Sequence, residues 1–260
     1  MPLTYSAYLK LDELLQLQQP LSTDPDHEEL LFIITHQAYE LWFKQIMHEL
    51  VALQRALADN QLSAALRYLK VILHILKVLV AQMDILETMS PVAFNRFRAR
   101  LESSSGFQSL QFRVVEFILG QRNPRVFQHY AAGEPARQRL ESLLKEPTLW
   151  DSFLLCLEKN GFVIPAALKT RDYAHPYEPS VEVQHHLVHI YRHELPLYQL
   201  CEFLVDLDEG LQEWRYRHLK MVERTIGIKP GTGGSSGAAY LQSTLTNPLF
   251  PDLWAIRAQL

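Results

Sequence analysis

The chain contains very little cysteine. Its 260 residues include only two, Cys156 and Cys201, which lie far apart and form no Cys-x-x-Cys motif. This spacing excludes a zinc-ribbon site and a thioredoxin-like redox motif. Two isolated thiols are typical of a reducing compartment, and we therefore expect a cytoplasmic protein.

Excess positive charge and long apolar runs are also missing. Lys and Arg total 25 against 29 for Asp and Glu, so the formal net charge is −4, unlike the basic surfaces that bind nucleic acid. The most apolar run, residues 71–86, is interrupted by four polar side chains and is too polar to span a membrane. Residues 1–15 lack the apolar segment of a signal peptide. We therefore expect neither nucleic acid nor a membrane among the partners.

Glycine and proline are absent from the longest segments. Residues 27–59 and 61–89 contain neither, and their apolar residues recur at helical spacing. Residues 181–194 and 197–226 show the same helical pattern. No alternating strand pattern, internal repeat or low-complexity linker is present. The sequence therefore predicts one all-α domain over residues 1–260, with a helical-bundle-like core.

Two helix starts are marked by a capping residue followed by proline. Asp24-Pro25 precedes the first long segment, and Ser90-Pro91 precedes a short helix predicted over residues 91–101. A further helix is predicted over residues 107–119, before Gly120. Pro147 is predicted to open the next helix.

Four of the ten glycines are concentrated in the segment GTGGSSG, residues 231–237. No Gly-Lys-Ser/Thr follows, so this is not a Walker loop, and a helix precedes it, so it is not a dinucleotide fingerprint. A flexible turn between helices is the simplest interpretation, because glycine is common at turns. The alternative is a mobile lid over residues 227–237, whose amides and hydroxyls (Thr232, Ser235 and Ser236) close on a small ligand.

Two histidines lie within apolar helical stripes. His218 shares a helix side with Trp214 and Met221, and His36 follows Phe32 by one turn. Both are compatible with hydrogen-bonded core histidines. His218 is also compatible with an axial haem ligand, which needs an imidazole presented from an apolar wall. His36, with its aromatic neighbours, is compatible with a slot for a flat ligand that carries one N–H or O–H group.

An aromatic residue and an arginine, Phe94 and Arg98, share a helix face at i,i+4 spacing. Such a pair can hold a ligand ring and a carboxylate at once, the carboxylate bidentately. Arg96 and Arg100 flank Arg98, so a solvated basic helix is the alternative.

A ladder of histidines provides the most metal-like spacing in the chain. His185, His189 and His193 repeat at i,i+4, and Glu182-x-x-His185 resembles half of a di-iron carboxylate site. No second Glu-x-x-His segment accompanies it. A polar helix face is the alternative.

Five segments together resemble the haem-dependent tryptophan 2,3-dioxygenase family. They are YSAYLKLDELL near the start, LFIITHQAYELWFKQIMHEL, SSGFQSLQFR at 104–113, WRYRHLKMVER and GTGGSSG. They occur in the family's order and span almost the whole chain. The resemblance implies an all-α homotetramer, a dimer of dimers, with one haem b per subunit. It also implies insertion of O₂ across the indole C2–C3 bond of L-tryptophan, which gives N-formylkynurenine and begins the kynurenine pathway.

The same resemblance implies a role for individual residues. His218 matches the proximal haem ligand, and His36 the distal histidine that hydrogen-bonds the indole N–H. We interpret His36 as the catalytic candidate that positions the substrate, not as an obligatory base. Arg98 matches the arginine that pairs with the substrate carboxylate, and Thr232 the threonine of the closing loop. The remaining substrate-binding candidates are Phe32, Phe94, Ser105 and Gly106, together with Tyr5 and Tyr8 of the segment 1–22, which reaches a neighbouring subunit's site in the family.

Two other functions remain as alternatives. One is a different haem enzyme on the same scaffold, which would use another aromatic amino acid or peroxide. The other is a helical binding or sensor protein without haem, which would use the histidine ladder of residues 185–193.

Overall fold

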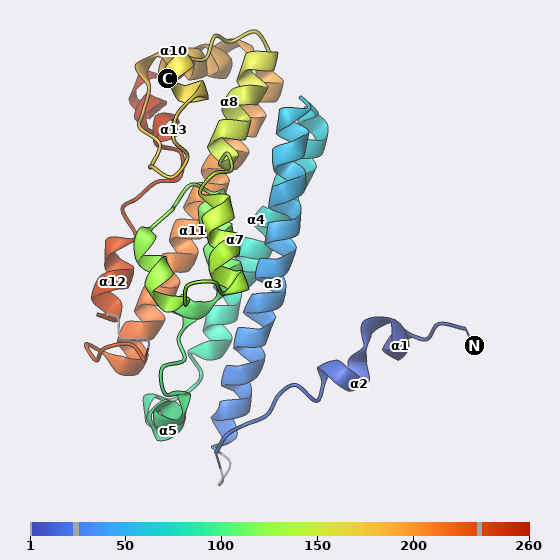
Figure 1. Cartoon of the computed structure of the whole chain (residues 1–260), viewed down its shortest axis with the longest axis vertical. Helices are drawn as coiled ribbons and strands as arrows, with labels where there is room; N and C mark the ends of the chain where they lie inside the picture. Colours follow the sequence, from blue (N-terminus) through green and yellow to red (C-terminus); the bar gives the residue numbers. More distant parts are fainter. Residues whose placement is uncertain (1, 23–25, 233–235) are drawn as a thin grey trace.

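Helices are the only regular elements in the part of the chain that the structure describes. This computed structural model describes residues 2–22, 26–232 and 236–260, and no strand occurs among them (Figure 1). The described residues therefore confirm the all-α prediction. None of their helices is long and apolar enough to cross a membrane.

Three long helices form the frame of the molecule. They are α3 (His27–Ala58), α4 (Leu62–Leu86) and α11 (Leu195–Ile226), and α4 packs against both of the others along the long axis (Figure 1). The chain turns between α3 and α4 at Asn60, whose φ of 56° lies in the left-handed region that asparagine tolerates. The sequence leaves open one long helix or two that meet near Asn60, and the structure shows two.

The start of α3 lies slightly later than the sequence predicts. Its N-cap residue is Asp26. Glu28 and Glu29 then occupy the first turn, where negative charge suits the positive end of the helix dipole. The predicted capping pair, Asp24 and Pro25, lies outside the described residues.

The short helix after α4 begins as predicted but ends early. In α5 (Pro91–Phe97), the Ser90 hydroxyl accepts a hydrogen bond from the Ala93 N–H. Residues Arg98–Leu101 then form a separate 3₁₀ turn, η1. The prediction of one helix over 91–101 is therefore wrong in its last turn, because the backbone tightens there as it often does at helix ends.

The helix predicted over residues 107–119 is also divided. A 3₁₀ turn, η2 (Gly106–Gln108), precedes α6 (Leu110–Ile118). Ser109 separates them, and its hydroxyl accepts a hydrogen bond from the Phe112 N–H. This side chain acts as an N-cap, and serine competes with helical backbone bonds in this way.

The remaining helices build the far end of the bundle and its flanks. Helix α8 begins two residues after Pro147, at Leu149, because Thr148 and Asp151 form a capping box. The other elements are η3 (Pro124–His129), α7 (Pro135–Leu143), α8 (Leu149–Lys159), α9 (Ala166–Lys169), α10 (Val181–His193), α12 (Ala238–Ser243), α13 (Pro251–Ala255) and η4 (Ile256–Gln259).

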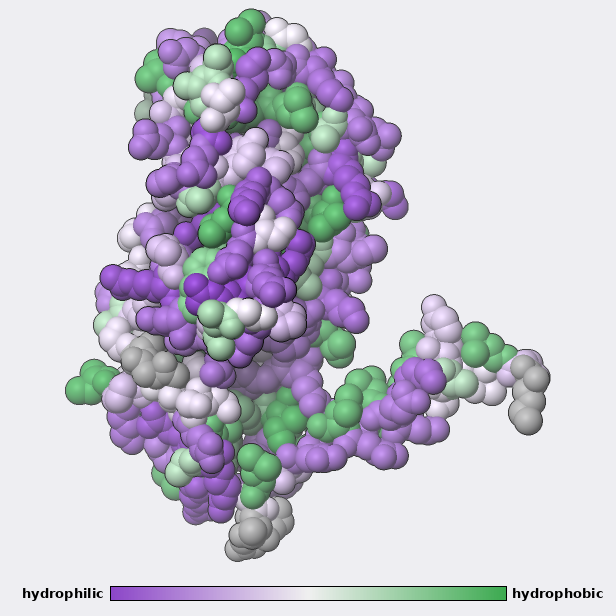
Figure 2. Space-filling model, viewed as in Figure 1, coloured by the Kyte–Doolittle hydropathy of each residue, from purple (hydrophilic) through white to green (hydrophobic). Residues whose placement is uncertain are grey.

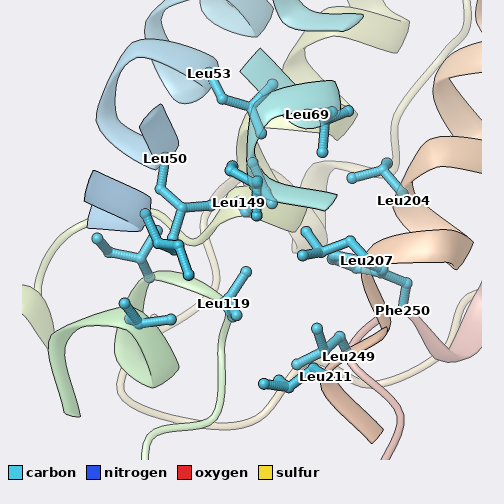
Figure 3. Close-up of a cluster of buried hydrophobic side chains, with 14 of the residues drawn as sticks. Leu50, Leu53, Leu69, Leu119, Leu149, Leu204, Leu207, Leu211, Leu249 and Phe250 are labelled. Atoms are coloured by element: carbon cyan, nitrogen blue, oxygen red, sulfur yellow. The ribbon is translucent and has the colours of Figure 1, made fainter. Parts of the chain in front are cut away.

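The hydrophobic core is rich in leucine and lies where α3, α4, α8 and α11 meet. Figure 3 shows Leu50 and Leu53 of α3, Leu69 of α4 and Leu204 of α11 with their side chains clustered together. All four are fully buried. Truncating such a side chain to alanine removes buried apolar area and leaves a cavity, which costs about 2–5 kcal/mol.

The N-terminal arm, residues 2–22, projects away from the bundle and carries α1 (Tyr5–Leu9) and α2 (Leu11–Leu14) (Figures 1 and 2). The C-terminal end of the arm is bound to α3, because the Glu29 carboxylate accepts hydrogen bonds from the Leu21 and Ser22 N–H groups. Apolar side chains along the arm face solvent. The exposed set is Leu3, Tyr5, Tyr8, Leu9, Leu15, Leu17 and Leu21.

Candidate functional site

A cavity of about 670 Å³ opens between the N-terminal half of α3 and the C-terminal half of α11. Its volume falls within the range of small-molecule sites, about 300–1,000 Å³. The C-terminal end of α4, helices α5, α6 and α12, the turns η1 and η2, and the loop after α11 supply further parts of its wall. Eight of the ten residues predicted for the site line it: Phe32, His36, Phe94, Arg98, Ser105, Gly106, His218 and Thr232.

His218 lies on the α11 wall of this cavity. Its ring is nearly parallel to that of Trp214, with centroids 5.6 Å apart. Burial, together with nearby His36 and Arg113, lowers the pKa of His218 to about 4. The imidazole is therefore neutral near pH 7, and neutral imidazole is the form that binds metals. A core histidine satisfied by hydrogen bonds does not describe this residue, since neither ring nitrogen is bonded to a described residue.

His36 lines the cavity from α3, one turn after Phe32. Its Nδ1 lies 2.7 Å from the Phe32 carbonyl oxygen, and the two ring centroids are 4.0 Å apart. A carbonyl can only accept, so Nδ1 carries the proton and donates it. Burial lowers the pKa of His36, which keeps the ring neutral and leaves Nε2 as an acceptor. Its Nε2 can therefore accept a hydrogen bond from an N–H group of a ligand.

An aromatic surface lies beside His36. The ring centroids of Phe32 and Phe94 are 5.8 Å apart, and those of Phe94 and the fully buried Phe97 are 5.4 Å apart. These rings come from α3 and α5, which pack against each other. The surface can hold a flat apolar ligand against the histidine.

The three arginines around α5 and η1 have different contacts. Arg96 and Arg100 form ion pairs with Asp26, at 3.9 and 3.4 Å, on the outer side of the turn. Arg98 instead lines the cavity and donates a hydrogen bond to the Pro230 carbonyl in the loop after α11. The alternative of a uniformly solvated basic helix therefore does not hold for Arg98, whose guanidinium is available to a ligand carboxylate.

Ser105 and Gly106 form the start of η2 on the cavity wall. The Ser105 hydroxyl caps this turn by accepting a hydrogen bond from the Phe107 N–H at 3.3 Å. A Cβ atom added at Gly106 would meet nothing within 4 Å, so the backbone borders open space there. A flat ligand can approach this backbone closely.

The loop after α11 contacts the cavity entrance in the part that the structure describes. The Thr232 hydroxyl donates a hydrogen bond to the Ser104 carbonyl at 2.6 Å. Gly237 closes the loop with φ of +61°, and a Cβ atom there would lie 2.8 Å from the Lys229 oxygen, so only glycine fits. Residues 233–235 of the predicted lid lie outside the described residues, and the opening of the lid remains a prediction.

Tyr5 and Tyr8 do not line this cavity. They lie on α1 in the N-terminal arm and are 75% and 71% exposed. This placement leaves them accessible to another molecule, as the predicted contact with a neighbouring subunit requires. That contact remains a prediction.

Sequence analysis missed a polar cluster on the α6 wall. Arg113 and Arg215 both form ion pairs with Glu116, at 2.8 and 2.9 Å. Nearby, the Gln111 amide donates to the Glu40 carboxylate at 2.9 Å. The sequence signal for this cluster was the presence of charged residues in the mostly apolar segment 110–119, because a buried charge is unfavourable unless it has a partner.

The histidine ladder on α10 does not form a metal centre in the described part of the chain. No group of three or more His, Cys, Asp or Glu residues able to hold a metal ion is found there. The rings of His189 and His193 are 4.7 Å apart, and the nearby His186 ring bonds the Val163 carbonyl. These contacts favour a polar helix face.

The donors around the cavity fit a haem. His218 offers a neutral imidazole that has no hydrogen-bond partner among the described residues, and apolar side chains such as Met83, Leu86 and Met221 line the same space. Arg113 also has a buried Nε atom that bonds no described residue. An iron porphyrin with carboxylate side chains needs a ligand for the iron, an apolar wall for the ring and a cation for the carboxylates. The cavity offers all three.

Comparison with known proteins gives a consistent result. The sequence profile of the tryptophan 2,3-dioxygenase family matches residues 1–183 and 181–260. A tryptophan 2,3-dioxygenase from Herpetosiphon aurantiacus is 58% identical over 258 residues, which cover 99% of this chain and 98% of that protein. The tryptophan 2,3-dioxygenase of Anaeromyxobacter dehalogenans is 53% identical, and the alignment covers 99% of this chain and 96% of that protein. The tryptophan 2,3-dioxygenase of Caulobacter vibrioides is 42% identical, and the alignment covers 99% of this chain and 98% of that protein. The chain therefore belongs to the tryptophan 2,3-dioxygenase family.

Proposed function

We propose that this protein is a haem-dependent dioxygenase that inserts both atoms of O₂ across the indole C2–C3 bond of L-tryptophan. The product is N-formyl-L-kynurenine, and the reaction is the first step of tryptophan degradation by the kynurenine pathway. One observation carries the proposal: His218, His36, Arg98 and Thr232, from four separate segments, line one cavity. Membership of the family supports the same reaction.

His218 would hold the iron of haem b through its imidazole. A bound haem supplies the iron chemistry with O₂, and the protein supplies orientation and an apolar environment. The neutral state of His218 and its position against Trp214 support this role.

The amino-acid end of tryptophan would be held by Arg98 and Thr232. Arg98 can pair with the substrate carboxylate through two N–H groups while it also holds the loop at Pro230. Thr232 is already at the cavity wall, bonded to Ser104. Residues 227–237 would therefore act as a lid whose closure and substrate binding support each other.

The indole ring would lie against Phe32 and Phe94. The unprotonated Nε2 of His36 would then accept a hydrogen bond from the indole N–H, because Nδ1 is committed to the Phe32 carbonyl. We assign His36 a positioning role, since its Nε2 can hold the indole N–H by accepting a hydrogen bond without removing the proton. Ser105 and Gly106 would border the ligands at η2.

We further propose a single catalytic domain over residues 1–260 that assembles as a homotetramer, a dimer of dimers. Exposed apolar side chains of the arm support this assembly, because such patches mark interaction surfaces. Tyr5 and Tyr8 would enter a neighbouring subunit's site. Light scattering of the full chain, and of a chain lacking residues 2–14, tests the assembly. The cytoplasmic location remains a prediction.

The activity is tested by aerobic incubation of reduced, haem-loaded protein with L-tryptophan. We expect N-formylkynurenine to accumulate, and we expect no product from L-tyrosine. Turnover of tyrosine in place of tryptophan would favour a different haem enzyme on this scaffold. Absence of haem binding and of product would overturn the proposal.

A further inference from the structure

Arg113 on α6 is buried beside the cavity but incompletely paired. It is only 6% exposed, and its guanidinium lies over the rings of Phe107 and Phe112, 5.8 and 4.7 Å from their centroids. Nη1 pairs with Glu116 at 2.8 Å. Nε is buried and has no hydrogen-bond partner in the part of the chain that the structure describes. A buried cation with open donors is unfavourable unless a further partner is present.

The only ion-pair partner of Arg113 in the described residues is shared with another arginine. Arg215, 5% exposed, pairs with the second oxygen of Glu116 at 2.9 Å. Arg215 is further satisfied by the Gln121 amide oxygen and the Thr244 carbonyl. One carboxylate therefore faces two guanidinium groups, and Arg113 is the one of the two whose buried Nε has no hydrogen-bond partner among the described residues.

The other carboxylate on the cavity wall does not supply the missing partner. The Glu40 carboxylate accepts from the Gln111 amide, and it forms no ion pair with the described residues. Arg98 lies in the cavity wall beside Thr232 and the loop, where the proposed function uses it for the substrate. The positive charge of Arg113 is thus left for an anionic group of a ligand.

We propose that Arg113 anchors a carboxylate side chain of the haem. The inference rests on the proposed function, because it concerns the same cavity. Haem b carries two propionate carboxylates, and a guanidinium binds a carboxylate through charge-assisted hydrogen bonds that are about twice as strong as neutral ones. Arg113 and His218 line the same cavity, so both can contact one ligand. Glu116 holds the guanidinium in place.

A comparison of two cofactors tests this anchor. Apoprotein of the wild type and of Arg113→Met is titrated with haem b and with haem dimethyl ester, in which both carboxylates are blocked. We expect Arg113→Met to bind haem b about 10- to 100-fold more weakly, as expected for loss of hydrogen bonds to a charged group. The two proteins should bind the dimethyl ester within about twofold of each other.

Two further variants separate an anchor from a structural role. Arg113→Lys keeps the charge and should recover part of the haem b affinity, while Arg139→Met removes a half-exposed arginine on α7 and should change nothing. Equal losses with both cofactors, or no loss with either, would overturn the anchor while leaving the proposed function intact. Failure of the wild type to bind haem would overturn both.

Discussion

Helix α3 contributes Leu50 and Leu53 to the packed core, and Phe32 and His36 to the cavity. Helix α11 also serves both regions, but its N-terminal half lies in the core with Leu204 and its C-terminal half lines the cavity with His218. One pair of helices therefore builds a close-packed region and a hollow region. In the core, apolar side chains interdigitate and stabilise the fold. Around the cavity, polar groups are held in place without filling the space between them.

The comparison separates residues that maintain the fold from residues that bind ligands. Truncations in the core should lower the free energy of unfolding and leave the ligands' contacts unchanged. Truncations in the cavity should weaken ligand binding and leave the free energy of unfolding nearly unchanged. The following substitutions test this separation, beginning with the largest expected effect.

His218→Ala should abolish or greatly weaken the Soret band of haem-supplied protein, because it removes the axial ligand. Unfolding of the haem-free variant at pH 7.5 should change little, since the ring forms no hydrogen bond with described residues. The exposed His74 of α4 provides the control, and His74→Ala should retain the full band. A normal Soret band in His218→Ala would contradict the ligand assignment.

Leu204→Ala should lower the free energy of unfolding by about 2–5 kcal/mol, because it leaves a cavity in the core. Urea titration measures this loss. The Soret position should be unchanged, since Leu204 does not line the cavity. Leu155 on α8 is 40% exposed, and Leu155→Ala serves as the matched control with a change within about 0.5 kcal/mol.

Arg98→Ala should raise KM for L-tryptophan by about 10- to 100-fold, because it removes a charge-assisted pair with the carboxylate. Haem binding should be retained. Arg96→Ala removes a neighbouring arginine that pairs with Asp26, and it should leave KM unchanged. Normal kinetics in Arg98→Ala would show that the substrate carboxylate is bound elsewhere.

Acid should destabilise the haem-free protein through His218. The pKa of this residue is about 4 when folded and 6.5 in the unfolded reference. Between these values the unfolded chain binds more protons, so the free energy of unfolding falls as the pH falls. From pH 7.5 to 5, the wild type should lose about 2 kcal/mol more than His218→Ala, by urea titration. Equal losses would mean that His218 is not held neutral.

Thr232→Ala should have the smallest effect, raising KM by about 2- to 10-fold through loss of one neutral hydrogen bond. Steady-state kinetics with L-tryptophan measures it. Thr232→Ser keeps the hydroxyl that reaches Ser104 and should stay close to the wild type. If both variants behaved alike, the hydroxyl would have no part in holding the loop or the substrate.

The sequence predicts the packed region better than the hollow one. Long helices follow from the absence of glycine and proline over residues 27–89, and the buried leucines follow from their periodicity. The division of residues 91–101 and 107–119 depends on local capping, such as that by Ser109, which competes with helix propensity.

Individual site residues could be recognised from the sequence, but the contacts between residues distant in the chain could not. His36 and His218 lie in apolar stripes, and the family resemblance implies their roles. The cluster of Arg113, Glu116 and Arg215 depends on a contact between residues 99 positions apart in the chain. Local periodicity contains no information about such a contact, because the fold alone brings these residues together.

Labelling of the oxygen atoms in the product tests the central claim most directly. Reduced, haem-loaded protein is incubated with L-tryptophan under ¹⁸O₂, and the product is analysed by mass spectrometry under conditions that limit exchange with water. We expect N-formylkynurenine that contains two labelled oxygen atoms. A product with one labelled atom or none, or the absence of product, would contradict the account of the cavity as a tryptophan-dioxygenating site.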